Sequence, residues 1–176
     1  AGICKRRFAC STGPNPTLFE WLASPIVYME TPFADRLREV MMTCFSQKKI
    51  LYHYLSMAER NYREFLTGDT VNAKKYFYVL RPVLACRWVL NRHAPPPMKF
   101  QTLAEAELPS VLSNEVRRLL QLKTEAPERK EIPRVDTIND FLEQQLSAIK
   151  EAIPSLPEEK ASSWAELNAL FLSAIA

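Results

Sequence analysis

Glycine is scarce in this chain. Only 3 of its 176 residues are Gly, whereas 13 are Pro. Tight hairpin turns and phosphate-binding loops both depend on glycine, since it adopts backbone angles that other residues avoid. The composition therefore argues against all-β folds, dinucleotide-binding fingerprints and P-loops, and it leaves helix as the expected structure.

Paired cysteines are also missing. The four cysteines, Cys4, Cys10, Cys44 and Cys86, are far apart in the sequence, and no C-x-x-C pair occurs. Structural zinc sites and compact disulfide frameworks need closer spacing. We expect reduced thiols, with the cysteines acting as small apolar residues of the core.

Long hydrophobic runs are absent as well. No run approaches the roughly 18 apolar residues that span a bilayer, and the basic N-terminal residues are not followed by the apolar region of a secretion signal. The sequence predicts a soluble, cytoplasmic protein that does not bind membranes. Its net charge of +3 is too small to indicate a nucleic-acid partner by itself.

Helical periodicity is what the sequence does contain. With 47% hydrophobic and 24% charged residues, the composition is that of an ordinary globular domain. Apolar residues recur every three or four positions, which predicts helices. These helices are expected at residues 16–24, 33–45, 48–66, 72–93, 103–108, 111–123, 135–153 and 162–175. Asn15 and Ser46 are the expected N-caps of the first and third helices, and Gly68 is expected to follow the end of the third.

The segment 72–93 is the most apolar part of the chain and is expected to be central and largely buried. It contains Pro82, which cannot donate a hydrogen bond to the carbonyl of Tyr78 and whose ring crowds that turn. A kink or a break is therefore predicted near residues 79–82. The predicted fold is an all-α multi-helix bundle around this central proline-kinked helix, with no strands.

Basic residues of the central segment are the first candidates for binding. A helical wheel places cations and aromatic rings on one stripe, an arrangement that suits a phosphate or a base. The stripe contains Lys74, Tyr78, Arg81, Ala85, Trp88 and Arg92. The alternative interpretation is structural: an arginine in so apolar a segment needs a partner, so Arg81 and Arg87 would pair with acidic residues of neighbouring helices.

Two histidines, His53 and His93, are present. Arg87 and His93 have the spacing of the R-x(4-6)-H pattern of helical HEPN ribonucleases, in which Arg stabilises a phosphate and His acts as acid or base. The structural alternative is that His93 interacts favourably with the C-terminal dipole of its helix. His53 follows Lys49 by one helical turn and is expected on a polar face.

Three stretches resemble a known family. They are residues 15–28 (N-P-T-L-F-E-W-L-A-S-P-I-V-Y), the pair 45–49 (F-S-Q-K-K) and 54–58 (Y-L-S-M-A), and residues 74–88 (K-K-Y-F-Y-V-L-R-P-V-L-A-C-R-W). Shorter likenesses follow at 96–100 and 119–123. These motifs resemble those of the YcgL-type predicted nucleotidyltransferases, which are members of the DNA polymerase beta superfamily.

The resemblance implies a catalytic α/β domain with a G-S turn and a D-x-D pair that binds two divalent metal ions, expected to be Mg²⁺. This chain contains neither a Gly-Ser dipeptide nor two aspartates at that spacing. The likeness therefore covers the C-terminal helical part only. We expect no catalytic residue, no metal ligand and no cofactor bound by this chain alone, and a missing N-terminal catalytic domain as its partner.

The first 14 residues match the family pattern poorly. Degenerate codons for residues 1–4, read one nucleotide earlier, can spell the G-W-D-L that the resemblance would place here, and those for residues 9–14 can spell L-L-H-G-P. We therefore hypothesise that residues 1–14 are a non-native reading of a longer gene, preceding a helical domain at 15–176. Cys4, Cys10 and the basic residues 5–7 would then have no evolved role.

The resemblance implies that this chain is the helical part of a nucleotidyltransferase that holds the nucleotide or the acceptor strand. The expected contacts to phosphate or base are made by Lys74, Lys75, Tyr76, Arg81 and Arg87, with Lys48, Lys49 and His53 as a second set. Two alternatives remain. One is a separate helical module for RNA processing or partner binding, with Arg87 and His93 as the ribonuclease pair. The other is an inactive remnant.

Overall fold

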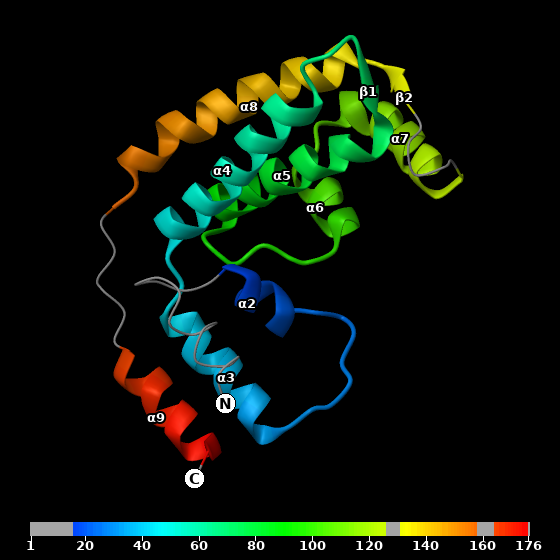
Figure 1. Cartoon of the computed structure of the whole chain (residues 1–176). Helices are drawn as coiled ribbons and strands as arrows, with labels where there is room; N and C mark the ends of the chain where they lie inside the picture. The colour runs from blue at the N-terminus through cyan, green and yellow to red at the C-terminus, as the bar shows by residue number, and fades with distance from the viewer. Residues whose placement is uncertain (1–15, 126–130, 158–163, 176) are drawn as a thin grey trace.

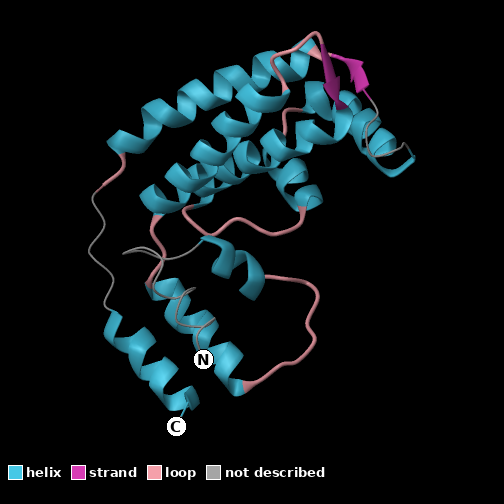
Figure 2. Ribbon diagram, in the orientation of Figure 1, coloured by secondary structure: helices cyan, strands magenta, loops and turns pink. Residues whose placement is uncertain are grey.

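The computed structural model describes residues 16–125, 131–157 and 164–175 of the chain, and helices dominate it (Figure 2). The helices are α2 (Pro16–Leu22), α3 (Pro32–Thr43), α4 (Gln47–Phe65), α5 (Tyr76–Arg92), α6 (Phe100–Glu107), α7 (Ser113–Glu125), α8 (Asp136–Ser155) and α9 (Trp164–Ile175), with short 3-10 turns η1 (Ala73–Lys75) and η2 (Ser110–Leu112). The all-α prediction is confirmed. Predictions for residues 1–14 and for the Asn15 cap lie outside the described residues.

Helix starts follow the capping signals in the sequence. The hydroxyl of Thr31 accepts a hydrogen bond from the backbone N–H of Ala34 at 3.2 Å, and Pro32 occupies the first turn of α3. The Ser46 hydroxyl accepts one from the backbone N–H of Lys49 at 3.4 Å, so the predicted cap of α4 is confirmed. These side chains satisfy N–H groups that have no partner within the helix.

The end of α4 differs from the expectation for glycine. Gly68 does not adopt positive φ; among the described residues that conformation occurs at His93, the C-cap of α5, with φ 53° and ψ 34°. The C-cap of α4 is instead Leu66, whose N–H donates to the carbonyl of Tyr62. A left-handed cap therefore closes α5, at a residue with a side chain, rather than α4.

Helix α5 is the centre of the bundle and packs against α4, α6 and α8 (Figure 1). Many of its side chains are buried, including Val79, Leu80, Val83, Leu84 and Val89. The helix starts at Tyr76 rather than at residue 72, because residues 70–75 form a strand and a 3-10 turn. Asn72 begins that turn: its side-chain oxygen accepts a hydrogen bond from the backbone N–H of Lys74 at 2.9 Å.

Pro82 lies inside α5 without interrupting it. Proline has no N–H, so the carbonyl of Tyr78, four residues earlier, loses its helical donor. Asn61 of α4 supplies a replacement, since its Nδ2 donates to that carbonyl at 3.1 Å. Of the two predicted outcomes, a kink or a break, the break does not occur.

A small sheet corrects the expectation that the chain has no strands. β1 (Thr70–Asn72) pairs antiparallel with β2 (Glu131–Pro133), with Val71 opposite Ile132. Val71 and Ile132 are buried, whereas their neighbours along each strand are more exposed. The sequence does not reveal these strands, because three residues are too few to show an alternating pattern. The paired residues Val71 and Ile132 are also about 60 residues apart in the sequence.

The first and last helices of the described chain, α2 and α9, both contact α3. Figure 1 shows α9 alongside α3. Cys44, directly after α3, and Cys86, within α5, are free and buried, as predicted for core thiols. Burial also raises the pKa of the Cys86 thiol. Within the described residues, the helices lack the length and apolarity to cross a bilayer.

Candidate functional site

Lys75 and Tyr78 form a cationic and aromatic surface at the start of α5. The Nζ of Lys75 lies 3.9 Å from the centre of the Phe65 ring and 4.7 Å from that of Tyr78. The Phe65 and Tyr78 rings meet edge to face, with centroids 6.4 Å apart. Tyr78 is 49% exposed. The exposed ring can stack on a base, and the ammonium group beside the ring can attract the phosphate of that nucleotide.

Arg81 lies one turn further along α5 and is tied to α2. Its NH1 contacts Glu20 Oε1 at 3.0 Å, and the same oxygen accepts a hydrogen bond from the Tyr54 hydroxyl at 2.5 Å. Arg81 NH2 also donates to the carbonyl of Met98 at 3.4 Å. The alternative interpretation of Arg81, pairing with an acidic residue of another helix, is therefore confirmed. Glu20, Tyr54 and Arg81 join α2, α4 and α5.

His53 lies at the edge of this cluster. Its ring meets Tyr54 edge to face, with centroids 5.4 Å apart. Burial lowers the pKa of His53, and the negative charge of Glu20 partly opposes that shift. The carboxylate of Glu20 thus pairs with Arg81 and influences His53 through its charge.

Tyr76 is fully buried. Its hydroxyl donates to Asn139 Oδ1 at 2.9 Å and accepts from the backbone N–H of Val135 at 2.8 Å. The ring and the hydroxyl are both engaged inside the bundle, so Tyr76 does not reach a ligand in this conformation. Its role here is to attach α8 to α5.

Arg87 belongs to a separate polar cluster around Glu107, which is 5% exposed. Arg87 Nε donates to the Glu107 carbonyl at 3.1 Å and lies 3.9 Å from its carboxylate, while Arg87 NH1 donates to Gln145 Oε1 at 2.6 Å. Asn91 donates to the carboxylate at 2.7 Å, and Arg92 lies 3.7 Å from it. The pairing of Arg87 with an acidic neighbour is confirmed, and it joins α5, α6 and α8.

His93 has a different partner from Arg87. Its Nδ1 lies 2.7 Å from Nε2 of Gln47, at the start of α4, whereas Arg87 bonds to α6 and α8. Arg87 and His93 therefore bond to different helices within the chain, and the ribonuclease pair remains a prediction that a single chain does not test.

The predicted stripe along α5 is not one continuous surface. Ala85, in its middle, is fully buried. The N-terminal end carries Tyr78 and Arg81, whereas at the other end Arg92 lies 4.3 Å from the centre of the Trp88 ring. Neighbouring helices cover the middle, which a helical wheel of α5 alone does not show.

Lys48 and Lys49 lie in the first turn of α4, whereas Phe65 ends that helix. At 1.5 Å per residue, this separates them by about 24 Å along the axis. Since Phe65 contacts Lys75, the second set of predicted lysines is not part of the Lys75–Tyr78 surface. Lys74 is in the turn η1 beside Lys75.

Sequence reasoning missed the acidic partners. Glu20 is a single acid among the apolar residues of α2, and Glu107 is the last residue of α6. The available signal was the pair of arginines in an apolar helix, which required buried acceptors. Asn61 and Phe65 were missed too, because their importance depends on how α4 crosses α5.

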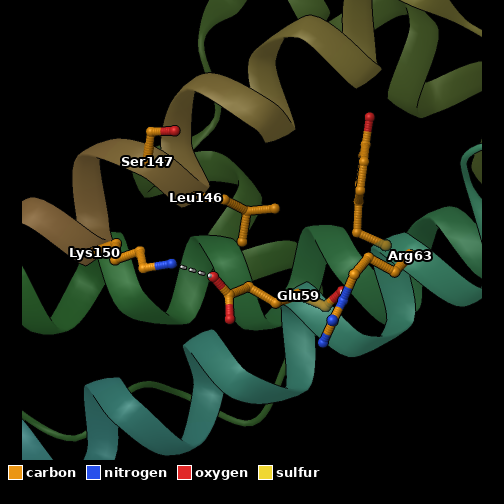
Figure 3. A pocket seen from close by; sticks show the side chains of 6 residues that line it. Glu59, Arg63, Leu146, Ser147 and Lys150 are labelled. Carbon is orange, nitrogen blue, oxygen red and sulfur yellow. Dashed lines mark hydrogen bonds and ion pairs between the residues drawn. The ribbon is translucent and has the colours of Figure 1, made fainter.

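An open groove of about 380 Å³ lies elsewhere, between α4 and α8 (Figure 3). It is lined by Glu59, Tyr62, Arg63, Leu146, Ser147 and Lys150. Lys150 points toward Glu59 and lies 3.6 Å from its carboxylate (Figure 3), so these charges offset each other. None of the predicted site residues lines the groove.

The resemblance implies a divalent metal, and the described carboxylates do not fit one. Across residues 16–125, 131–157 and 164–175, no three His, Cys, Asp or Glu side chains gather as metal ligands would. We assign no residue of this set to a metal.

Comparison with known proteins agrees with the sequence resemblance. The chain is 41% identical over 167 residues to the uncharacterized protein YcgL of Bacillus subtilis (strain 168); the match covers 92% of the chain and 63% of YcgL. The chain thus spans less than two thirds of that relative. No solved structure matches it significantly. A model of the RNA repair pathway DNA polymerase beta family, RlaP, matches residues 8–173. The chain belongs to this RlaP family.

Proposed function

We propose that this chain is the helical, substrate-binding part of a nucleotidyltransferase that acts in RNA repair. Family membership supports the reaction class, since the family is described as a DNA polymerase beta family of an RNA repair pathway. The observation that carries the binding role is the Lys75–Tyr78 surface. It presents a half-exposed ring and a cation at the start of a largely buried helix.

On this surface, a base stacks on Tyr78 and its phosphate lies near the ammonium group of Lys75. Stacking on an aromatic side chain is worth about 1–3 kcal/mol per base, and it accepts any base. Phe65 helps to hold Lys75 and Tyr78 in place, because its ring contacts both side chains. The surface therefore holds a nucleotide whatever its base.

Arg81 and Arg87 have a positioning role in this proposal. Arg81 fixes α2 against α5 through Glu20, and Arg87 fixes α6 and α8 through Glu107 and Gln145. Nucleotidyl transfer itself needs carboxylates that hold two metal ions. We propose that another domain supplies them, so this chain binds but does not catalyse.

Titration of ATP and the other ribonucleoside triphosphates with Mg²⁺ tests the proposal on the 176-residue chain. Lys75→Gln should weaken binding about tenfold or more, as expected for loss of one close charge pair. Lys150→Gln is the matched control, because Lys150 is an exposed lysine on α8 that pairs with Glu59 rather than with Phe65 or Tyr78. Equal binding by the two folded variants would contradict the proposal.

A further inference from the structure

The loop between α2 and α3 exposes consecutive apolar residues. Ile26, Val27, Tyr28 and Met29 are 66%, 54%, 96% and 77% exposed, and Trp21 just before them is 49% exposed. Figure 1 shows this loop on the outside of the molecule, away from the bundle. Contiguous apolar side chains in water are unfavourable, and such a patch on a soluble domain marks an interaction surface. We name residues 26–29 with Trp21 the loop patch.

Arg38 of α3 holds both ends of the loop. Its Nε donates to the carbonyl of Leu22, where the loop starts, at 3.2 Å. Its NH1 binds Glu30, near the end of the loop, and Asp35. The Ser24 hydroxyl also accepts from the backbone N–H of Ile26 at 3.2 Å. The loop patch is thereby presented in a defined shape, which reduces the entropy lost when a partner binds.

The surroundings of the loop patch have the composition of a protein interface. Glu30, Asp35 and Arg38 form a charged rim beside the apolar residues. An apolar centre with a polar rim is typical of the contacts between domains and between proteins.

We infer that the loop patch is the docking surface for the catalytic domain of the longer proteins in this family. This inference rests on the proposed function. More than a third of YcgL lies outside the region that matches this chain. That remaining part needs a surface to pack against, and the loop patch is the largest run of exposed apolar residues in the described chain.

Position supports the same occupant. α2 precedes the loop and carries Glu20, which bonds to Arg81 one turn from Tyr78 on α5. A domain seated on the loop patch would therefore adjoin α2, the helix that this ion pair connects to α5.

Amide hydrogen exchange tests the inference on intact YcgL and on this chain. We expect the segment of YcgL aligned with residues 24–31 to exchange about tenfold or more slowly than the same segment of this chain, because a docked domain limits local opening. Serine at the positions aligned with Ile26 and Tyr28 should abolish that protection in YcgL. Serine at the position aligned with Val111, which is also an exposed apolar residue, should leave it unchanged.

Equal exchange in the two proteins would overturn the inference. Protection that grows with the concentration of this chain alone, accompanied by a dimer in sedimentation, would also overturn it, since the occupant would be a second copy. Neither readout depends on nucleotide binding. A protected loop in a protein with no Lys75-dependent binding would therefore reject the proposed function alone.

Discussion

Asn61 of α4 donates a hydrogen bond to the carbonyl of Tyr78, the group that Pro82 leaves without its helical donor. Tyr78 thus has a side chain available at the candidate site and a backbone carbonyl held by a neighbouring helix. The bond connects α4 to the part of α5 that presents the Lys75–Tyr78 surface. It keeps α5 continuous where the sequence predicts a kink or a break.

Removing this bond should destabilise the chain. Asn61→Ala leaves the Tyr78 carbonyl without a protein donor and should cost about 1 kcal/mol, equivalent to a fall of about 2–4 °C in Tm for a chain of this size. In a Pro82→Ala background, the restored N–H can bond to that carbonyl. The cost of Asn61→Ala should therefore shrink in a double-mutant cycle of thermal unfolding. Additive losses would show that Asn61 does not substitute for the missing helical donor.

Glu20 should matter mainly for stability. Glu20→Ala leaves both Arg81 and Tyr54 without their shared acceptor, and it should lower the free energy of unfolding by about 2 kcal/mol. The loss for Glu20→Ala combined with Arg81→Ala should be smaller than the sum of the single losses.

Glu39→Ala serves as the control for Glu20, since Glu39 pairs with Arg36 on an exposed face. Exposed pairs contribute about 0–1 kcal/mol. Denaturant unfolding measures all of these variants. A loss for Glu20→Ala no larger than that for Glu39→Ala would contradict a joining role for Glu20.

Acid should destabilise the chain through His53. Burial lowers the pKa of His53 in the folded protein, so below the ordinary histidine pKa of about 6.5 the unfolded chain binds the extra proton more readily. The stability that neutral His53 allows is present above that pH and is lost as the pH falls through it. The range from pH 7.5 to 5.5 extends about one pH unit to either side of that ordinary value. When the pH is lowered across it, Tm should fall more for the wild type than for His53→Gln. Parallel curves would contradict the assignment.

The His93→Gly variant should be more stable than the His93→Ala variant. It adopts φ 53°, which glycine reaches without strain but which costs other residues about 1 kcal/mol. His93→Gly and His93→Ala both remove the contact with Gln47, so their difference isolates the backbone. We expect His93→Gly to be more stable by about 1 kcal/mol in thermal unfolding. Equal stabilities would show that the backbone at this position relaxes.

The helices could be predicted because each is encoded locally. For α4, the N-cap Ser46 and the apolar residues that recur every three or four positions lie within about twenty residues of sequence. The β1–β2 pair could not be predicted, since Val71 and Ile132 are about 60 residues apart in the sequence, with α5, α6 and α7 between them. The left-handed C-cap at His93 also escaped prediction, because residues in this conformation are usually glycine and position 93 is a histidine.

The candidate site was predicted in part. Basic and aromatic residues of α5 were identified, but their partners depend on how helices cross. Glu20 reaches Arg81 because α2 lies over α4 and α5, and Phe65 reaches Lys75 because α4 ends beside η1. A helical wheel could not show that Tyr76 and Ala85 are buried, since it treats α5 alone.

Binding of a short fluorescent single-stranded RNA by the Tyr78→Leu and Tyr52→Leu variants is the most direct test of the central claim. Both tyrosines are about half exposed, at 49% and 55%, and Tyr52 is on α4 away from Lys75. Loss of one stacked base should weaken binding by Tyr78→Leu about fivefold to a hundredfold, with Tyr52→Leu close to wild type. Equal affinities of the two variants, measured by anisotropy on folded protein, would contradict the claim that Tyr78 and Lys75 hold the substrate.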